Sequence, residues 1–218
     1  MSLRCLCLPD ESLSQIITRV KKIKSRECDL IEIGISSMKK TEWESAVAHM
    51  FNATKHPLML ASRGEKLTQE TVQIYEAALD AGWKWIDVDM SSPKKYIQQL
   101  TEKIIKKKAR LILSTHLKST PSISLIQKKI EHMHTLKAIP KVVTTITKEK
   151  NLITLLHTLA LFKKRPVILH GIGVKSRESR LLQAAGGSAI TYLCLEPKLA
   201  TAKGQWTIDD WNRTIRAL

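Results

Sequence analysis

Residues Ala138–Thr145 read Ala-Ile-Pro-Lys-Val-Val-Thr-Thr, an apolar and β-branched run that is typical of a buried strand. Lys141 stands in the middle of it, and burying an ammonium is costly unless the charge is paired or neutralised. Two explanations are open. The lysine can mark a strand end, with its head in solvent. Alternatively, an apolar wall lowers its pKa and makes the neutral amine a nucleophile for carbonyl carbon.

The pattern around this run recurs along the whole chain, since each short apolar stretch is followed by an amphipathic stretch with helical spacing. The expected strands are residues 3–8, 29–35, 57–61, 85–90, 110–114, 139–144, 166–170 and 188–193. The expected helices are residues 9–23, 41–51, 68–82, 94–105, 120–136, 148–162, 177–185 and 207–215. About eight βα units with strands apolar on both faces predict a (β/α)8 TIM barrel, with residues 1–218 as one α/β domain. A doubly wound sheet usually has fewer units, and no G-x-G-x-x-G follows an early strand.

The composition, 43% hydrophobic and 26% charged, is that of a globular protein. No apolar run approaches the roughly 18 residues of a membrane span, and the apolar N-terminal segment is too short for a signal peptide. We therefore expect a cytoplasmic protein without a membrane partner. Cys5-x-Cys7 lacks the usual zinc spacing, so the four cysteines are expected to be buried free thiols, with no metal.

The net charge of +16 raises the question of nucleic acid. The basic residues form short clusters within 21–26, 106–110 and 163–165, near the ends of expected helices, where cations complement the helix dipole. Two Phe and three Tyr supply few rings for base stacking. We therefore expect no nucleic-acid partner, and an anionic small substrate suits the charge equally well.

In a barrel, the functional side chains lie at the carboxyl ends of the strands. Polar residues occur there on almost every expected strand: Glu32, Arg63, Glu65, Asp87, Asp89, Ser114, His116, Lys141, His170, Arg177 and the loop 201–205. Their convergence on one mouth favours a functional Lys141. His116 is expected just past its strand end, beside the strand of Lys141, and this pairing joins an acid–base group to an imine-forming amine.

These residues give the sequence a resemblance, over the whole chain, to the type I 3-dehydroquinate dehydratases of the shikimate pathway. The motifs follow the family's order: Ser-x-His then Thr-Pro at Ser114, His116, Thr120 and Pro121; the strand-six lysine at Lys141; Ser-Arg at Ser176–Arg177; Gly-Ser-x-x-Thr-Tyr at Gly187–Tyr192; the loop before Gln205 at Thr201–Gln205; and an Asp-x-Glu-like Asp87–Asp89. Each motif is weak alone, and the ordered set is strong.

The resemblance implies a lyase that forms a Schiff base between Lys141 and the ketone of 3-dehydroquinate. His116 would act as general base and then general acid, without a metal or diffusible cofactor. Arg177 would hold the substrate carboxylate. The other implied substrate-binding residues are Glu32, Arg63, Thr201 and Gln205, supported by Glu65, Asp87 and Asp89. To be nucleophilic near neutrality, Lys141 should have a pKa about 2–3 units below the usual value of about 10.4. The family also implies a homodimer and, in some organisms, fusion to a shikimate dehydrogenase.

The sequence departs from the family pattern on two strands. Gly34 stands where the family has an arginine, and the family's histidine-orienting glutamate falls at Leu67, so Glu32, Glu65 and Asp89 are all candidates to support His116. Two alternatives also stay open. One is another Schiff-base barrel enzyme of the aldolase class, and the other is a non-catalytic basic binding module.

Overall fold

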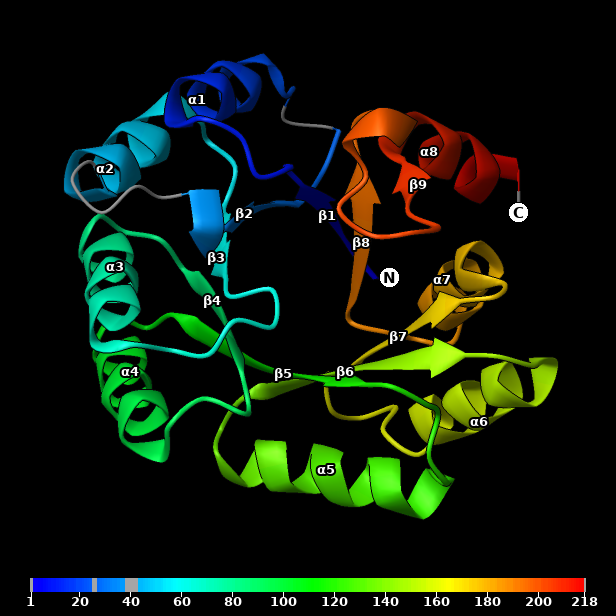
Figure 1. Ribbon diagram of the computed structural model, residues 1–218. Helices are drawn as coiled ribbons and strands as arrows, with labels where there is room; N and C mark the ends of the chain where they lie inside the picture. The colour runs from blue at the N-terminus through cyan, green and yellow to red at the C-terminus, as the bar shows by residue number, and fades with distance from the viewer. Residues whose placement is uncertain (1, 25–26, 38–42, 218) are drawn as a thin grey trace.

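Eight βα units follow one another around a common axis in this computed structural model, which describes residues 2–24, 27–37 and 43–217 (Figure 1). The strands are β1 (Leu3–Cys7), β2 (Leu30–Gly34), β3 (Leu58–Ala61), β4 (Trp85–Asp89), β5 (Arg110–Leu117), β6 (Ile139–Ile146), β7 (Ile168–Gly173), β8 (Ile190–Cys194) and β9 (Trp206–Thr207). The helices are α1 (Leu13–Lys22), α2 (Trp43–Ala53), α3 (Gln69–Asp80), α4 (Lys94–Lys106), α5 (Ile123–Thr135), α6 (Glu149–Ala160), α7 (Ser176–Ala185) and α8 (Ile208–Ala217). The predicted α/β barrel is confirmed.

The strands form one parallel sheet in the order β7-β6-β5-β4-β3-β2-β1-β8-β9. The helices lie in a ring outside it and cover its outer face (Figure 1), while side chains of the strands themselves fill the interior. Between β7 and β8 the described residues form no strand ladder. The two strands are joined at their amino ends instead, where Ala189 N donates to Val167 O at 2.8 Å and Leu169 N donates to Ser188 Oγ.

Apolar side chains fill two regions, one between the sheet and the helices and one inside the barrel. The interior region contains Cys5, Cys7, Leu30, Met59, Trp85, Ile112, Ile168, Ile190 and Tyr192. This layer fills the lower part of the barrel, and the cavity lined by the strand ends lies above it, at the carboxyl-end mouth. In the described part of the chain, every helix is too short or too polar to cross a membrane.

The element boundaries differ from expectation at the mouth. Strand β5 continues to Leu117, so His116 lies within the strand, and the expectation that it follows the strand end is wrong. Its longer ladder with β6, which pairs His116 with Val143, explains the extension. The short strand β9 was not expected. The expected helix 41–51 corresponds to α2, which begins at Trp43, and residues 41–42 lie outside the described residues.

Candidate active site

Lys141 and two histidines face the interior from three neighbouring strands. The register aligns Ser114, Lys141 and Ile168 at one level of β5, β6 and β7. Two residues further on, it aligns His116, Val143 and His170. Because alternate strand residues share a face, both rows point into the barrel.

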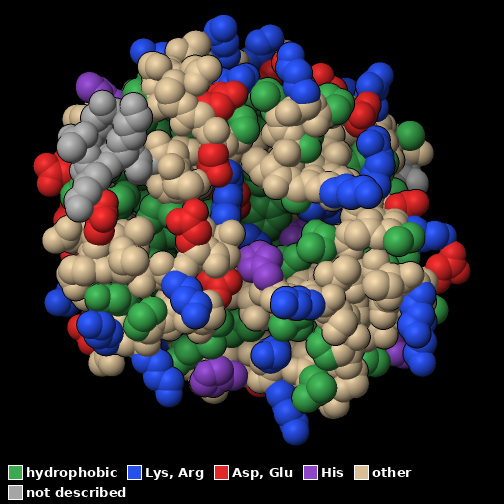
Figure 2. Space-filling view, viewed as in Figure 1, with side chains coloured by type: hydrophobic (Ala, Val, Ile, Leu, Met, Phe, Trp, Pro, Cys, Tyr) green, Lys and Arg blue, Asp and Glu red, His purple; other side chains and the backbone are tan. Residues whose placement is uncertain are grey.

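These rows form part of the wall of a cavity of about 240 Å³ at the carboxyl-end mouth. The lining residues are Cys7, Glu32, Arg63, His116, Lys141, Val143, His170, Ile172, Arg180, Tyr192, Thr201, Ala202 and Gln205. Figure 2 shows a hollow in the middle of this face, with a histidine side chain at its edge. Most of the residues expected at the site therefore meet in one place.

The Lys141 ammonium is buried at the floor of the cavity. Its Nζ donates to Asp87 Oδ2 at 2.6 Å and lies 4.3 Å from the ring centroid of Tyr192. Burial favours the neutral amine, but the carboxylates of Asp87 and Glu32 outweigh burial and raise the pKa of Lys141. The expected low pKa is therefore wrong for the unliganded protein, because the sequence did not reveal that Asp87 would pair with the amine.

The ring of His116 contacts the carboxylate of Asp89. Nδ1 of His116 lies 3.3 Å from Asp89 Oδ2, and the histidine side chain is 40% exposed at the mouth. Burial raises the pKa of Asp89, but hydrogen bonds with His116 and Ser91 outweigh burial and leave this pKa below its usual value. The carboxylate is therefore ionised at neutrality. Glu65 is exposed in the turn after β3, so among the candidate carboxylates Asp89 is the one that orients the histidine.

Glu32 and Arg63 form an ion pair on the β2–β3 side of the cavity. Arg63 Nε donates to Glu32 Oε1 at 3.0 Å, Nη1 donates to Asp10 Oδ1 at 2.7 Å, and Nη2 donates to Leu8 O at 2.6 Å. A Cβ on Gly34 would lie 2.5 Å from Asp10 Oδ1 and 2.8 Å from Arg63 Nη1. The Asp10–Arg63 pair thus occupies the space beside the position where the sequence lacks the family's arginine.

The two arginines of α7 lie in different environments. Arg177 is half exposed, stacks over the Trp206 ring at 3.8 Å and pairs loosely with Asp210 at 3.5 Å, outside the cavity lining. Arg180 is buried, lines the cavity, and its Nε has no hydrogen-bond partner in the described part of the chain. Burial lowers the pKa of Arg180, which signals a guanidinium without a close carboxylate.

The loop after β8 closes one side of the mouth. Gln205 Oε1 accepts hydrogen bonds from Thr201 N at 2.7 Å and from Ala202 N at 3.3 Å, which orders the turn. Gly204 has a φ of +76°, and a Cβ there would lie 1.9 Å from Ser176 Oγ. Only glycine allows the loop to pack so tightly on α7, which brings the expected residues Thr201 and Gln205 to the cavity.

The four cysteines are buried free thiols, as predicted. Cys5, Cys7 and Glu32 place one potential metal ligand each within 4.8 Å of one another. Glu32 is already bound to the Arg63 guanidinium at 3.0 Å, and the Lys141 ammonium lies near enough to lower the pKa of Cys5, although burial raises it more. A divalent ion there would have to displace one cation and tolerate another.

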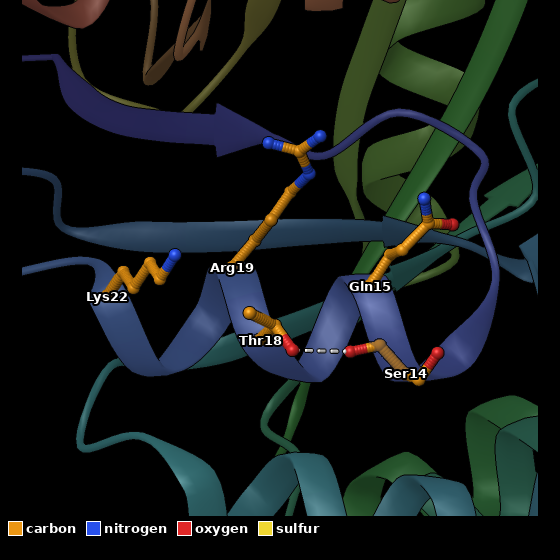
Figure 3. Close-up of a pocket in the computed structure, with 5 residues that line it drawn as sticks. All are labelled: Ser14, Gln15, Thr18, Arg19 and Lys22. Atoms are coloured by element: carbon orange, nitrogen blue, oxygen red, sulfur yellow. Dashed lines mark hydrogen bonds between the residues drawn. The ribbon is translucent and has the colours of Figure 1, made fainter.

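A second pocket lacks the chemical groups that the candidate site brings together. It lies on the outer surface of α1, between the side chains of Ser14, Gln15, Thr18, Arg19 and Lys22 (Figure 3). Thr18 Oγ1 donates to Ser14 O at 2.8 Å, and Arg19 is paired with Glu11. This pocket therefore holds no acid–base pair and no buried amine.

Comparison with known proteins identifies the family. A model of type I 3-dehydroquinase matches residues 4–218. The chain belongs to this family. A 3-dehydroquinate dehydratase of Thermodesulfovibrio yellowstonii is 27% identical over 214 residues, which cover 93% of this chain and 91% of that protein. The resemblance read from the sequence is confirmed.

Solved structures of the same enzyme share the fold. The type I 3-dehydroquinate dehydratase of Clostridium difficile, described with covalently modified comenic acid, matches with a TM-score of 0.88 at 22% identity, covering 99% of this chain and 92% of that chain. The enzyme of Geobacillus kaustophilus matches with a TM-score of 0.89 at 18% identity, covering 100% and 91%. At such identities these likenesses establish the fold alone.

Three residues near the cavity were missed or undervalued at the sequence level. Arg180 was overlooked because Ser-Arg occurs twice, at 176–177 and 179–180, and the first pair was matched to the family motif. The structure decides between them, since the buried residues of α7 are Ser176, Ser179, Arg180 and Gln183. Asp10 had no distinguishing signal, because it acts through a contact with the distant Arg63. Tyr192 belongs to the Gly-Ser-x-x-Thr-Tyr motif, but its contact with Lys141 joins residues distant in sequence.

Proposed function

We propose that this protein is a type I 3-dehydroquinate dehydratase, a hydro-lyase of the shikimate pathway that removes water from 3-dehydroquinate through a Lys141 imine. One observation carries the proposal. A buried lysine amine lies on the floor of a cavity whose wall also carries His116, and the ring of that histidine contacts the carboxylate of Asp89. An imine-forming amine next to an acid–base group is what elimination beside a ketone requires.

The first step is imine formation at the floor of the cavity. Lys141 rests as an ammonium, and Asp87 Oδ2 at 2.6 Å is placed to hold the proton that it must lose. The neutral amine attacks the ketone carbon, the carbinolamine loses its hydroxyl as water, and a C=N bond replaces the C=O bond. Asp87 returns the proton with which that hydroxyl leaves as water, and its carboxylate is then the counter-charge of the protonated imine.

The second step is elimination by His116. Its free nitrogen, Nε2, takes a proton from the carbon next to the imine, and the C–H electrons pass into the imine to give an enamine. The enamine electrons then expel the hydroxyl, and His116 returns the proton to it as water. Asp89 stabilises the imidazolium between the two transfers. Hydrolysis of the imine releases 3-dehydroshikimate and regenerates Lys141.

We assign the substrate carboxylate to Arg180, in place of Arg177. The Arg180 guanidinium is buried, faces the cavity and has an unpartnered Nε within the described residues, whereas Arg177 is stacked on Trp206. A guanidinium matches a carboxylate with two parallel hydrogen bonds. Glu32, Thr201 and Gln205 line the same cavity and remain assigned to the hydroxyls and the carboxylate edge.

A borohydride trap tests the chemistry directly. Incubating the protein with 3-dehydroquinate and sodium borohydride should add one reduced ligand to Lys141, found by peptide mass mapping. Aldolase substrates run in parallel address the other Schiff-base class. A protein that turns over 3-dehydroquinate without ever forming this adduct contradicts the imine mechanism.

Variants separate the two catalytic roles. Lys141→Ala should abolish both the adduct and turnover. His116→Ala should lower kcat by about 10²–10⁴-fold, the usual contribution of a positioned acid–base group, while still forming the adduct. If neither substitution changed the behaviour of the protein, and if the protein bound polyanions with an affinity that fell steeply with salt, the results would favour the alternative of a non-catalytic basic binding module.

We also propose that the protein is a cytoplasmic homodimer that binds no nucleic acid. The support is the family resemblance for the dimer, and the composition for the location and partners. Light scattering coupled to size exclusion measures the mass in solution, and a monomer at micromolar concentration would contradict the dimer. Cell fractionation with an antibody to the chain tests the location.

A further inference from the structure

A second histidine in the cavity is left without a role by the mechanism above. His170 lies on β7 at the level of His116, with Val143 of β6 between them. Two residues below Val143 is Lys141, so the reactive amine is flanked by a histidine on each neighbouring strand. The two rings differ in setting, because His116 is partly exposed and held by Asp89 while His170 is 3% exposed.

Both ring nitrogens of His170 lack a partner within the described residues, although the ring is buried. Its nearest ring neighbour, Tyr192, contacts it edge-on with centroids 5.1 Å apart, and the Tyr192 hydroxyl is likewise unpartnered. Buried polar groups are almost always hydrogen-bonded in folded proteins, because an unmet donor or acceptor is costly. His170 lines the cavity, so a ligand bound there can reach this side chain.

The charge state of His170 follows from its surroundings. Burial is the main cause that lowers its pKa well below the usual value, and the cations Arg180 and Lys141 lower it further. The third titratable group near the ring, beside Arg180 and Lys141, is Tyr192 on β8, which contacts it edge-on. His170 is therefore a neutral imidazole, with one N–H donor and one acceptor nitrogen.

The position of His170 indicates which end of the substrate it meets. His170 and Arg180 belong to the same βα unit, on the side of the cavity opposite Glu32 and Arg63. With the carboxylate on Arg180, the carbon that bears it lies at this end. In 3-dehydroquinate that carbon also carries the hydroxyl that departs.

We propose that His170 is a binding subsite for the hydroxyl on the carboxylate-bearing carbon of the substrate. This inference rests on the proposed function. A hydroxyl both donates and accepts, so it can satisfy either nitrogen of a neutral imidazole, whereas an ionised carboxylate only accepts. The hydrogen bond holds the departing hydroxyl in place for protonation by His116.

The test compares two ring acids that differ at this hydroxyl. Quinate carries the hydroxyl and shikimate lacks it, and neither has the ketone that traps Lys141. Their binding by calorimetry is measured for the wild type, for His170→Met, for His170→Gln and for the exposed control His157→Met on α6. Met keeps the bulk of the side chain without hydrogen-bonding strength, and Gln keeps a donor and an acceptor.

We expect His170→Met to weaken quinate binding about tenfold, the effect of one good hydrogen bond, and to change shikimate binding less than twofold. His170→Gln should recover part of the loss, and His157→Met should match the wild type. With 3-dehydroquinate, His170→Met should lower kcat/KM about tenfold and still form the borohydride adduct.

Equal weakening of both acids would overturn the proposal, because the contact would then be to a group that they share. Unchanged binding of both would overturn it as well. The arms also separate the two ideas. A wild type that binds quinate through His170 but forms no adduct sinks the dehydratase proposal alone, whereas an active enzyme indifferent to His170→Met sinks only the subsite.

Discussion

The two sides of the cavity are built differently. On the β2–β3 side, Glu32, Arg63 and Asp10 satisfy one another through hydrogen bonds of 2.7–3.0 Å, and Leu8 O takes a further N–H. On the β7–β8 side, polar atoms of His170, Arg180 and Tyr192 have no partner in the described chain.

This difference separates structure from binding. A satisfied ion-pair network is preorganised before a ligand arrives, and its members change little on binding. Unpartnered buried groups are destabilising in the free protein and are compensated only when a ligand pairs with them. The closed β2–β3 side therefore sets the shape of the cavity before a ligand arrives, and we expect the open β7–β8 side, whose polar atoms are unpaired among the described residues, to gain most from contact with the substrate.

The largest expected effect is on the pair that spans the floor. Asp87→Asn removes the charged partner of the buried Lys141 ammonium, and breaking a buried ion pair costs about 3–5 kcal/mol. Urea unfolding monitored by circular dichroism measures this loss. The control is Asp80→Asn, whose pairs with Lys103 and Lys107 are exposed and should cost less than about 1 kcal/mol. Similar losses for the two variants would contradict the buried pair.

Arg180→Met is expected to raise KM for 3-dehydroquinate about 10- to 100-fold. A hydrogen bond between charged groups contributes about 1.5–3 kcal/mol, and a tenfold change corresponds to about 1.4 kcal/mol. Steady-state kinetics measure it, with Arg177→Met as the matched control that should stay within about twofold of wild type. The reverse ranking would return the carboxylate to Arg177 and make the β7 side the structural one.

His170 predicts a pH dependence of stability. Its pKa is lowered in the folded protein, so below about pH 6.5 the unfolded chain binds a proton that the folded protein does not, and stability falls as pH falls. Between pH 6.5 and 5, wild type should lose up to about 1.4 kcal/mol per pH unit more than His170→Met. Urea unfolding across this range measures both slopes, and parallel curves would show that the ring is not buried neutral.

The smallest effect is expected at the rim of the closed side. Asp10→Asn removes a half-exposed partner of Arg63, which keeps Glu32 and Leu8 O, so stability should fall by about 0.5 kcal/mol and kcat/KM should change less than about twofold. Thermal unfolding and initial rates measure these. A tenfold loss of activity would mean that the closed side also binds substrate through Asp10.

Much of this protein could be predicted from sequence because the signals are local. The eight apolar runs, the helical spacing between them and Gly82 at a helix end depend on neighbours in the chain. The placement of His116 and Lys141 on neighbouring strands followed from strand order alone, since consecutive βα units place consecutive strands side by side.

What only the tertiary structure decided is how charges meet across the barrel. The sequence indicates that Lys141 is buried, which by itself lowers an amine pKa, but Asp87, 54 residues away, reverses the shift at 2.6 Å. The sequence likewise cannot choose between Arg177 and Arg180, because the rotation of α7 about its axis determines which of the two side chains enters the cavity. Coulomb interactions depend on distance through space, so a one-dimensional pattern locates the charged residues and folding determines their partners.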